Sequence, residues 1–344
     1  MSSDFRPSEE QVALLRVVLA EGVLAVQTRF AEWAELVDID RAPPGAHGLL
    51  PALSRIAEAA GVDHEWMGRL RGVYRRHWTA GQLVLQATAN AAAVLESADV
   101  DFLRPADQQL ASLLAEPAVF ALERPRLTVR WAECERALTA LEDAGWIPEP
   151  ESGGPSTLRR RLTWSSRTVE HPDGSRIDLV ASFNPRLIGD HRDAQLWDRA
   201  ESAGAARGSV APADLFVAAL CDEIAVDGAL RWVLPAGALL AEYPDGFDLA
   251  PLLDLASARL MLPALAIRMS LLNAELPSEG AALLTEEIER IARRHSPRSG
   301  AVGSLLDFGG RRRRAVARFP SAIGQIVVRH GGVRGAIRVA RGAG

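Results

Sequence analysis

A tight turn near the middle of the chain places the strongest limit on its fold. The sequence HPDG at 171–174 separates two stretches of strand-forming residues, 157–170 and 175–183. Proline, aspartate and glycine in this order favour a hairpin turn, because proline fixes its own backbone angle and glycine tolerates a positive one. In the second stretch one face carries Ile177, Leu179, Ala181 and Phe183, and the other carries Arg176, Asp178 and Ser182. The sequence therefore predicts a β-hairpin with one apolar and one polar face.

The rest of the chain is patterned mostly for helices. Short strands are predicted at 100–104 and 126–131, and a helix follows at 131–144. The first helix should begin at Ser8, where SEEQ forms a capping box with Gln11. The other helices are predicted at 27–37, 48–60, 64–96, 212–226, 229–242, 248–274 and 280–295. We therefore expect an α+β fold, in which a small mixed β-sheet core is flanked by N- and C-terminal helical regions.

This order of elements predicts four regions. They are an N-terminal helical region at 1–96, an α/β core at 97–200, a C-terminal helical region at 210–296, and a linker with an arginine-rich tail at 297–344. The last 34 residues contain nine arginines and no acidic residue, so they carry about +9 in a chain of net charge −5. The first 310 residues are correspondingly acidic.

The tail permits three kinds of partner. It can dock on an acidic protein or peptide (the rest of this chain included), bind nucleic acid by neutralising phosphates, or lie on a membrane surface as an amphipathic helix. We expect docking, because the interleaved aromatic residues that single-stranded nucleic acid usually requires are missing. The candidate partner-binding residues are Arg311, Arg312, Arg313, Arg314 and Arg318.

Every one of the 39 basic residues is arginine, and the chain has no lysine. A high-GC bacterial source would explain this bias. Schiff-base catalysis, a Walker-type P-loop and a kinase-type ATP lysine are excluded in their usual forms. Phosphate contacts must therefore come from arginine, histidine, backbone amides or a metal.

The composition indicates a soluble cytoplasmic protein. Hydrophobic residues make up 48% of the chain, and no apolar run approaches the roughly 20 residues that a membrane helix needs. The polar N-terminus does not have the pattern of a signal peptide. Cys134 and Cys221 are far apart and lack metal-ligand spacing, so we expect buried thiols in a reducing compartment.

Several segments between about 45 and 275 resemble an uncharacterised bacterial nucleotidyltransferase family, related to the DNA polymerase β-like superfold. The most specific are ECERALTALEDAGWIPEP, a helix that ends in Gly-Trp, and LRWVLPAGALL, a helix that begins with Arg-Trp. The others are HGLLPALSRIAEAAGV, AVLESADVDFLRP and SRIDLVASFNP. The resemblance implies a nucleotidyltransferase-like core. Its chemistry uses a Gly-bearing turn, an Asp-x-Asp pair and a third carboxylate on a neighbouring strand, which together hold two Mg²⁺ ions and a nucleoside triphosphate.

In the register of this resemblance the metal motif is degraded. Arg124 and Arg126 stand where the Asp-x-Asp pair belongs, and only Asp178 matches the third carboxylate. Arg104 keeps the charge of the family's lysine, Pro105 replaces its glycine, and Pro235 replaces a further aspartate. The candidate catalytic residue is Asp178. The candidate nucleotide- or phosphate-binding residues are Arg104, Arg124, Arg126 and Arg176.

Asp178 also has a structural interpretation, as a surface carboxylate paired with Arg159 or Arg161 of the hairpin. His171 and His191 lie near the same strand. Either could join it in a metal site, but a histidine beside PDG is usually a turn residue.

The stretch ADVDFLRP at 98–105 contains an Asp-x-Asp pair outside that register. Asp99, Asp101 and Asp178 are therefore the alternative metal ligands. A catalytic pair of this kind needs a flexible turn so that backbone amides approach phosphate, and no glycine occurs from Gln82 to Ala144. We expect instead a strand entry with exposed carboxylates.

Three functions follow. The first is a degenerate nucleotidyltransferase-fold protein that binds a partner, peptide or nucleotide, within a biosynthetic pathway as the resemblance allows; no cofactor is expected. The second is an active divergent nucleotidyltransferase, which would use Mg²⁺ and a nucleoside triphosphate. The third is a nucleic-acid or acidic-peptide binding protein that acts through its tail. The sequence names neither the substrate nor the oligomeric state.

Overall fold

The structure is a computed structural model. It describes residues 7–39, 42, 44–114, 116–120, 122, 125–149, 166–181, 190–202, 208–221, 229–243, 262–277 and 281–290. The described helices are α1 (Glu9–Val18), α2 (Val23–Leu36), α3 (Leu50–Ala59), α4 (Met67–Ser97), α5 (Ala106–Ser112), α6 (Cys134–Asp143), α8 (Asp190–Ser202), α9 (Pro212–Cys221), α10 (Val233–Glu242) and α12 (Leu262–Glu275). Residues 281–290 are also helical. The strands are β1 (Phe102–Leu103), β2 (Arg126–Val129), β3 (Ile147–Pro148), β4 (Ser166–Glu170) and β5 (Arg176–Val180).

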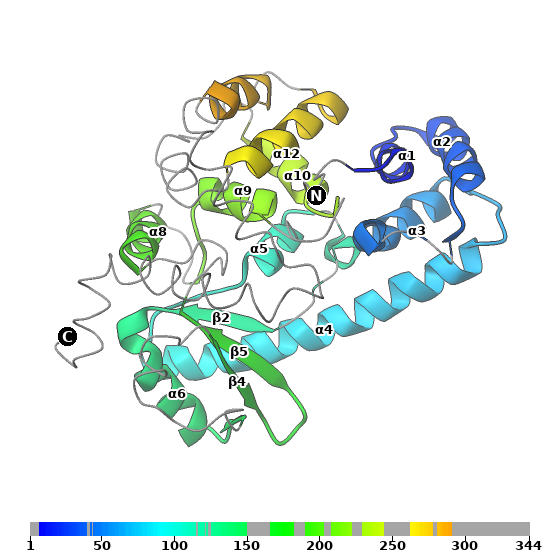
Figure 1. The fold of residues 1–344 in the computed structure, drawn as a ribbon. Coiled ribbons are helices and arrows are strands. Elements are labelled where there is room, and N and C mark those ends of the chain that lie inside the picture. Colours follow the sequence, from blue (N-terminus) through cyan, green and yellow to red (C-terminus); the bar gives the residue numbers. More distant parts are fainter. Residues whose placement is uncertain are drawn as a thin grey trace, which may run out of the picture. The chain divides into compact units, whose positions relative to one another are not determined.

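The described residues divide into two compact units (Figure 1). The first unit consists of the described residues within 1–82, 110–122 and 216–307. The second unit consists of the described residues within 83–109 and 123–215. The first unit is helical apart from short turns, and the second contains the whole sheet. The prediction of an α+β chain with one small mixed sheet, and with helices before and after it, is confirmed.

The five strands form one sheet in the order β1-β2-β5-β4-β3. β2 and β5 run parallel, whereas the other neighbouring pairs are antiparallel. The predicted hairpin is β4–β5, with Glu170 opposite Arg176. Its turn closes with a hydrogen bond from His171 N–H to Ser175 O of 2.7 Å, and Gly174 adopts the positive φ of 87° that the turn requires.

The core of the second unit lies on one face of this sheet. Leu127 and Val129 of β2 and Ile177 and Leu179 of β5 are buried there. They pack with the last turns of α4 and with α6, whose buried side chains are Cys134, Ala137, Leu138 and Leu141. Because side chains alternate along a strand, the residues between these apolar ones, Thr128 and Asp178, point to the other face.

Local sequence signals explain how the first unit begins. The capping box at Ser8 is present: Gln11 N–H donates to Ser8 Oγ, and Ser8 N–H donates to Gln11 Oε1. The core buries Leu14 and Leu15 of α1, Phe30 and Trp33 of α2, and Leu53 of α3. None of the helices within the described ranges is both long enough and apolar enough to cross a bilayer.

Of the α-helices and strands named above, α5, β3 and α8 lie outside the predicted ranges. The α8 sequence DHRDAQLWDRAES is mostly polar, and within the part of it whose burial is described, 195–201, the buried residues are Leu196, Trp197 and Ala200. Such a short apolar stripe is a weak helical signal, because tertiary packing supplies most of the stability of a short helix. The predicted helical residues 248–261, the predicted strand residues 157–165 and Phe183 lie outside the described ranges.

Candidate functional site

The face of the sheet opposite the core carries a polar group on three adjacent strands. Arg126 and Thr128 come from β2, Asp178 from β5 and Thr168 from β4. Their positions follow from the alternation that buries Leu127 and Leu179 on the core face. We call these four residues the polar face.

Arg126 and Asp178 lie directly beside each other in the parallel pair β2–β5. The backbone fixes this register, because Asp178 N–H donates a hydrogen bond of 2.9 Å to the carbonyl of Pro125. Asp178 Oδ1 accepts a hydrogen bond of 2.7 Å from Thr168 Oγ1. Within the described part of the chain no ion pair joins the guanidinium of Arg126 to this carboxylate. An arginine and an aspartate therefore share one site without neutralising each other directly.

The polar face has unused hydrogen-bonding capacity. Arg126 Nε is buried and has no hydrogen-bond partner among the described groups, and the same holds for Thr128 Oγ1. Thr128 is only 2% exposed, whereas Arg126 and Asp178 are half-buried. A buried donor without a partner costs about 1–3 kcal/mol. The guanidinium of Arg126 therefore has hydrogen-bonding capacity that no described side chain uses at Nε.

Among the described residues, Arg104 and Arg176 form no hydrogen bond or ion pair with the polar face, although alternation puts Arg176 on the same side of β5 as Asp178. Arg176 is exposed and forms an ion pair with Glu149. Arg104 is exposed and follows β1, where its backbone N–H donates to Gly208 O at 2.7 Å. Arg124 lies outside the described residues. Of the four arginines, Arg126 is the one that the structure places beside Asp178.

The alternative metal ligands are not brought together. Asp101 precedes β1 and lies 3.9 Å from Arg130 Nε, at the end of β2 opposite to Arg126. Four residues of strand span about 13 Å, so Asp101 and Asp178 are far apart. Asp99 has a positive φ of 52° in the turn after α4, and its carbonyl accepts a hydrogen bond from Arg136.

The implied Mg²⁺ and nucleoside triphosphate can be tested against these positions. A two-metal centre needs several carboxylates at one point, and the polar face offers Asp178 beside a guanidinium. In the described ranges no three His, Cys, Asp or Glu side chains are grouped as metal ligands. The described residues of the polar face therefore do not fit a two-metal centre.

The histidines and the tail fall outside the polar face or outside the described residues. His171 lies in the hairpin turn, with Nδ1 3.1 Å from Asp173 Oδ1 and its ring 5.2 Å from that of Trp146. The side chain of His191, both Arg159 and Arg161, and the whole of 297–344 lie outside the described residues. The candidate partner-binding arginines, from Arg311 to Arg318, therefore stay a prediction.

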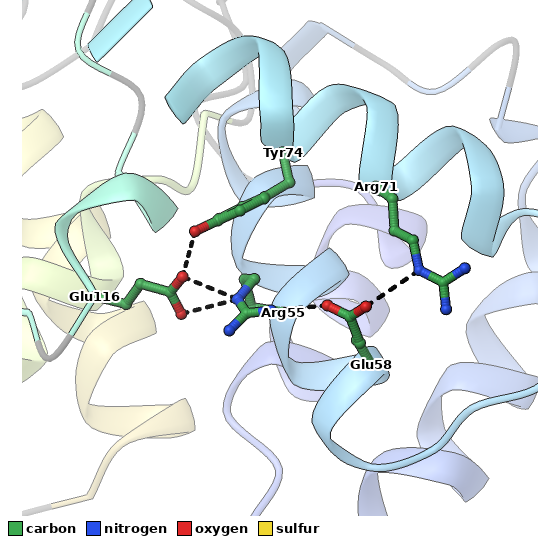
Figure 2. Close-up of polar contacts among 5 residues, drawn as sticks. All are labelled: Arg55, Glu58, Arg71, Tyr74 and Glu116. Carbon is green, nitrogen blue, oxygen red and sulfur yellow. Dashed lines mark hydrogen bonds and ion pairs between the residues drawn. The ribbon is translucent and has the colours of Figure 1, made fainter. Parts of the chain in front are cut away.

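A second polar cluster, in the first unit, was missed by the sequence analysis (Figure 2). Arg55 Nε donates to both carboxylate oxygens of Glu116, at 2.9 and 3.0 Å, and Tyr74 Oη donates to the same carboxylate. Glu58 binds Arg55 at 2.7 Å and Arg71 at 3.2 Å. The cluster joins α3, α4 and the segment at 116, and no local motif could have revealed contacts between residues so far apart in sequence.

Electrostatics in this cluster favour the ionised form of Glu116. Burial alone would raise the pKa of Glu116, but the hydrogen bonds from Tyr74 and Arg55 and the charge of Arg55 lower it below its ordinary value. Burial and the neighbouring carboxylate raise the pKa of Tyr74. Since every group in the cluster already has a partner, we assign it to stability rather than to ligand binding.

Two further arginine contacts hold the second unit together. The guanidinium of Arg130 lies 4.5 Å above the ring of Trp197 and pairs with Glu201. Arg199 binds Asp214, which is 4% exposed, through hydrogen bonds of 2.5 and 3.0 Å. Burial raises the pKa of Asp214, and the hydrogen bonds and charge of Arg199 oppose that rise.

Comparison with known proteins adds no relative. No protein-family model, curated protein or solved structure matches this chain.

Proposed function

We propose that this chain is a catalytically degenerate nucleotidyltransferase-like protein that binds a ligand bearing an oxyanion, without metal-dependent nucleotidyl transfer. The observation that carries the proposal is the register that sets Arg126 beside Asp178 on parallel strands. The ligand is a nucleotide or a peptide, with its phosphate or carboxylate bound at the polar face.

The geometry supports this assignment in the following way. The resemblance puts the Asp-x-Asp pair and the third carboxylate on neighbouring strands, and in this chain Arg126 and Asp178 do lie on neighbouring strands in register. This adjacency supports the layout that the resemblance implies, with reversed charge at Arg126. At a separation of about 5 Å and an effective dielectric constant of about 20, a guanidinium and Mg²⁺ repel each other by several kcal/mol. The same guanidinium attracts an oxyanion.

The hydrogen-bonding state of the polar face supports an anionic ligand. The guanidinium of Arg126 has no bound carboxylate among the described side chains, and the hydroxyl of Thr128 has no partner there. Arginine binds phosphate and carboxylate through paired N–H groups, which makes it the natural contact for either. Thr168 donates to one oxygen of Asp178 and so holds that carboxylate toward β4, on the side away from Arg126 in the strand order.

The proposal also includes a cellular compartment and a class of binding partner. We propose a cytoplasmic protein, since the described Cys134 is a buried thiol that forms no disulfide. We propose a protein or peptide partner, which the arginine-rich tail would recognise by its acidic groups.

The experiment is a calorimetric titration of ATP into the full chain in the presence of EDTA. Three proteins are compared: the unchanged chain, Arg126→Met and Arg176→Met. Methionine keeps much of the arginine stem and removes the charge, and Arg176 is the matched control because it is exposed and paired with Glu149. We expect binding to the unchanged chain and to Arg176→Met, with a loss of about tenfold or more in Arg126→Met.

Two outcomes would contradict the proposal. If ATP binding requires Mg²⁺ and disappears in Asp178→Asn, the chain is an active divergent nucleotidyltransferase. If neither ATP nor an acidic peptide binds to the unchanged chain, the polar face is not a ligand site.

A further inference from the structure

Helix α4 carries an exposed arginine–tryptophan surface that the proposed ligand site does not use. Arg71, Arg75, Trp78 and Gln82 are spaced by four, three and four residues, so they form one stripe along the helix. All four are exposed, and Trp78 has 49% of its surface in water. We call this stripe the arginine–tryptophan face.

The charge of this part of α4 is unusual for the chain. Residues 67–95 contain four arginines and no aspartate or glutamate, although acidic residues outnumber basic ones overall by 44 to 39. Arg71 is partly neutralised by Glu58 at 3.2 Å. Arg75 has no ion pair or hydrogen bond to any group in the described ranges. The face therefore presents one unneutralised positive charge close to a large apolar ring.

This combination is typical of a protein-binding surface. Arginine and tryptophan dominate the binding energy of protein interfaces, where a desolvated ring is surrounded by polar contacts. A tryptophan buries about 150–250 Å² when it is covered, so a half-exposed ring offers a partner considerable apolar area. The free charge of Arg75, one turn before Trp78, selects for a carboxylate at that position.

We propose that the arginine–tryptophan face of α4 docks an acidic amphipathic segment of a partner protein. An apolar side chain of that segment covers Trp78, and a carboxylate pairs with Arg75. Nucleic acid is a poorer match, because Glu58 pairs with Arg71 on this face and would repel a continuous line of phosphates.

The test uses the full chain and three probes. They are a synthetic helical peptide with leucine on one face and glutamate elsewhere, its counterpart with lysine in place of glutamate, and an oligothymidylate. Dissociation constants are measured for the unchanged chain and for Arg75→Glu, Trp78→Gln and Arg76→Glu. Arg76 is the matched control, since it is exposed, adjacent and of the same charge, yet it points about 100° away around the helix.

We expect the glutamate peptide alone to bind the unchanged chain. Arg75→Glu and Trp78→Gln should each weaken it about tenfold, whereas Arg76→Glu should change affinity by less than about threefold. Unchanged melting temperatures would show that the variants fold. Equal losses in Arg75→Glu and Arg76→Glu would overturn the proposal, because they would indicate a diffuse charge effect. Failure of the glutamate peptide to bind, or tighter binding of oligothymidylate that depends on Arg75, would overturn it as well.

Discussion

Thr168 donates a hydrogen bond of 2.7 Å to Asp178 from directly across the antiparallel pair β4–β5. The bond orients the carboxylate that lies beside Arg126. Thr168→Val keeps the branched shape and removes the donor, so we expect it to lower the free energy of unfolding by about 1 kcal/mol. Urea unfolding measures this. In Asp178→Asn the asparagine oxygen still accepts the hydrogen bond, so the loss of unfolding free energy should be smaller than in Thr168→Val. Equal losses in the two variants would mean that the charge of Asp178, rather than the hydrogen bond, provides the stability.

The Glu116 cluster predicts a loss of stability in acid. Because the folded state lowers the pKa of Glu116, its contribution is fully present above the ordinary value of 4.5 and declines as pH falls below it. Glu116→Gln should cost about 1 kcal/mol at neutral pH, a modest figure because the side chain is 36% exposed. Urea unfolding over a pH series measures the free energy of unfolding of the unchanged chain and of Glu116→Gln. The difference between these two free energies should become smaller below pH 4.5. A difference that stays constant with pH would assign the effect to packing.

Removing Arg199 should be among the more damaging changes in the second unit. It would leave the carboxylate of Asp214 buried without its cation. Arg199→Met should lower the free energy of unfolding by about 3 kcal/mol. Thermal or urea unfolding provides the comparison with Asp214→Asn, in which the remaining charge lies on Arg199, whose side chain is 23% exposed, so the loss should be smaller. If Asp214→Asn lowers the free energy of unfolding more than Arg199→Met does, the cost of burying an unpaired carboxylate is not the main effect.

Two glycines have the same backbone conformation, but we expect their replacement by alanine to lower the free energy of unfolding by different amounts. Gly208 and Gly174 have φ of 85° and 87°. A Cβ on Gly208 would lie 2.9 Å from the ring of Phe102, which is 2% exposed, whereas a Cβ on Gly174 would meet open space. Gly174→Ala should cost about 1 kcal/mol from backbone strain alone, and Gly208→Ala about 2–3 kcal/mol. Equal losses of unfolding free energy would mean that Phe102 moves aside freely.

Much of the fold follows from local sequence. Ser8 and Gln11 mark the start of α1, and Pro172, Asp173 and Gly174 mark the turn between β4 and β5. In both cases the sequence signal and the structure it predicts involve the same few neighbouring residues. The short strands β1 and β2 fall within their predicted ranges for the same reason. By contrast, α8 is stabilised by packing of Leu196 and Trp197. Its own sequence is mostly polar and does not predict this helix.

The candidate site was only partly accessible from the sequence. The alternation around Asp178 predicts its face of the sheet, but the pairing of β2 with β5 joins residues 52 positions apart. Only the resemblance suggested that Arg126 and Asp178 belong together. The contact between Tyr74 and Glu116 had no such guide, because side chains from α4 and from the segment at 116 meet only after the helices have packed.

The dissociation constant of ATP as a function of free Mg²⁺ tests the central claim most directly. Our account predicts that the unchanged chain binds ATP equally well or better when Mg²⁺ is chelated, since Arg126 is the cation at the site. An affinity that rises with Mg²⁺, persists in Arg126→Met and vanishes in Asp178→Asn would contradict it.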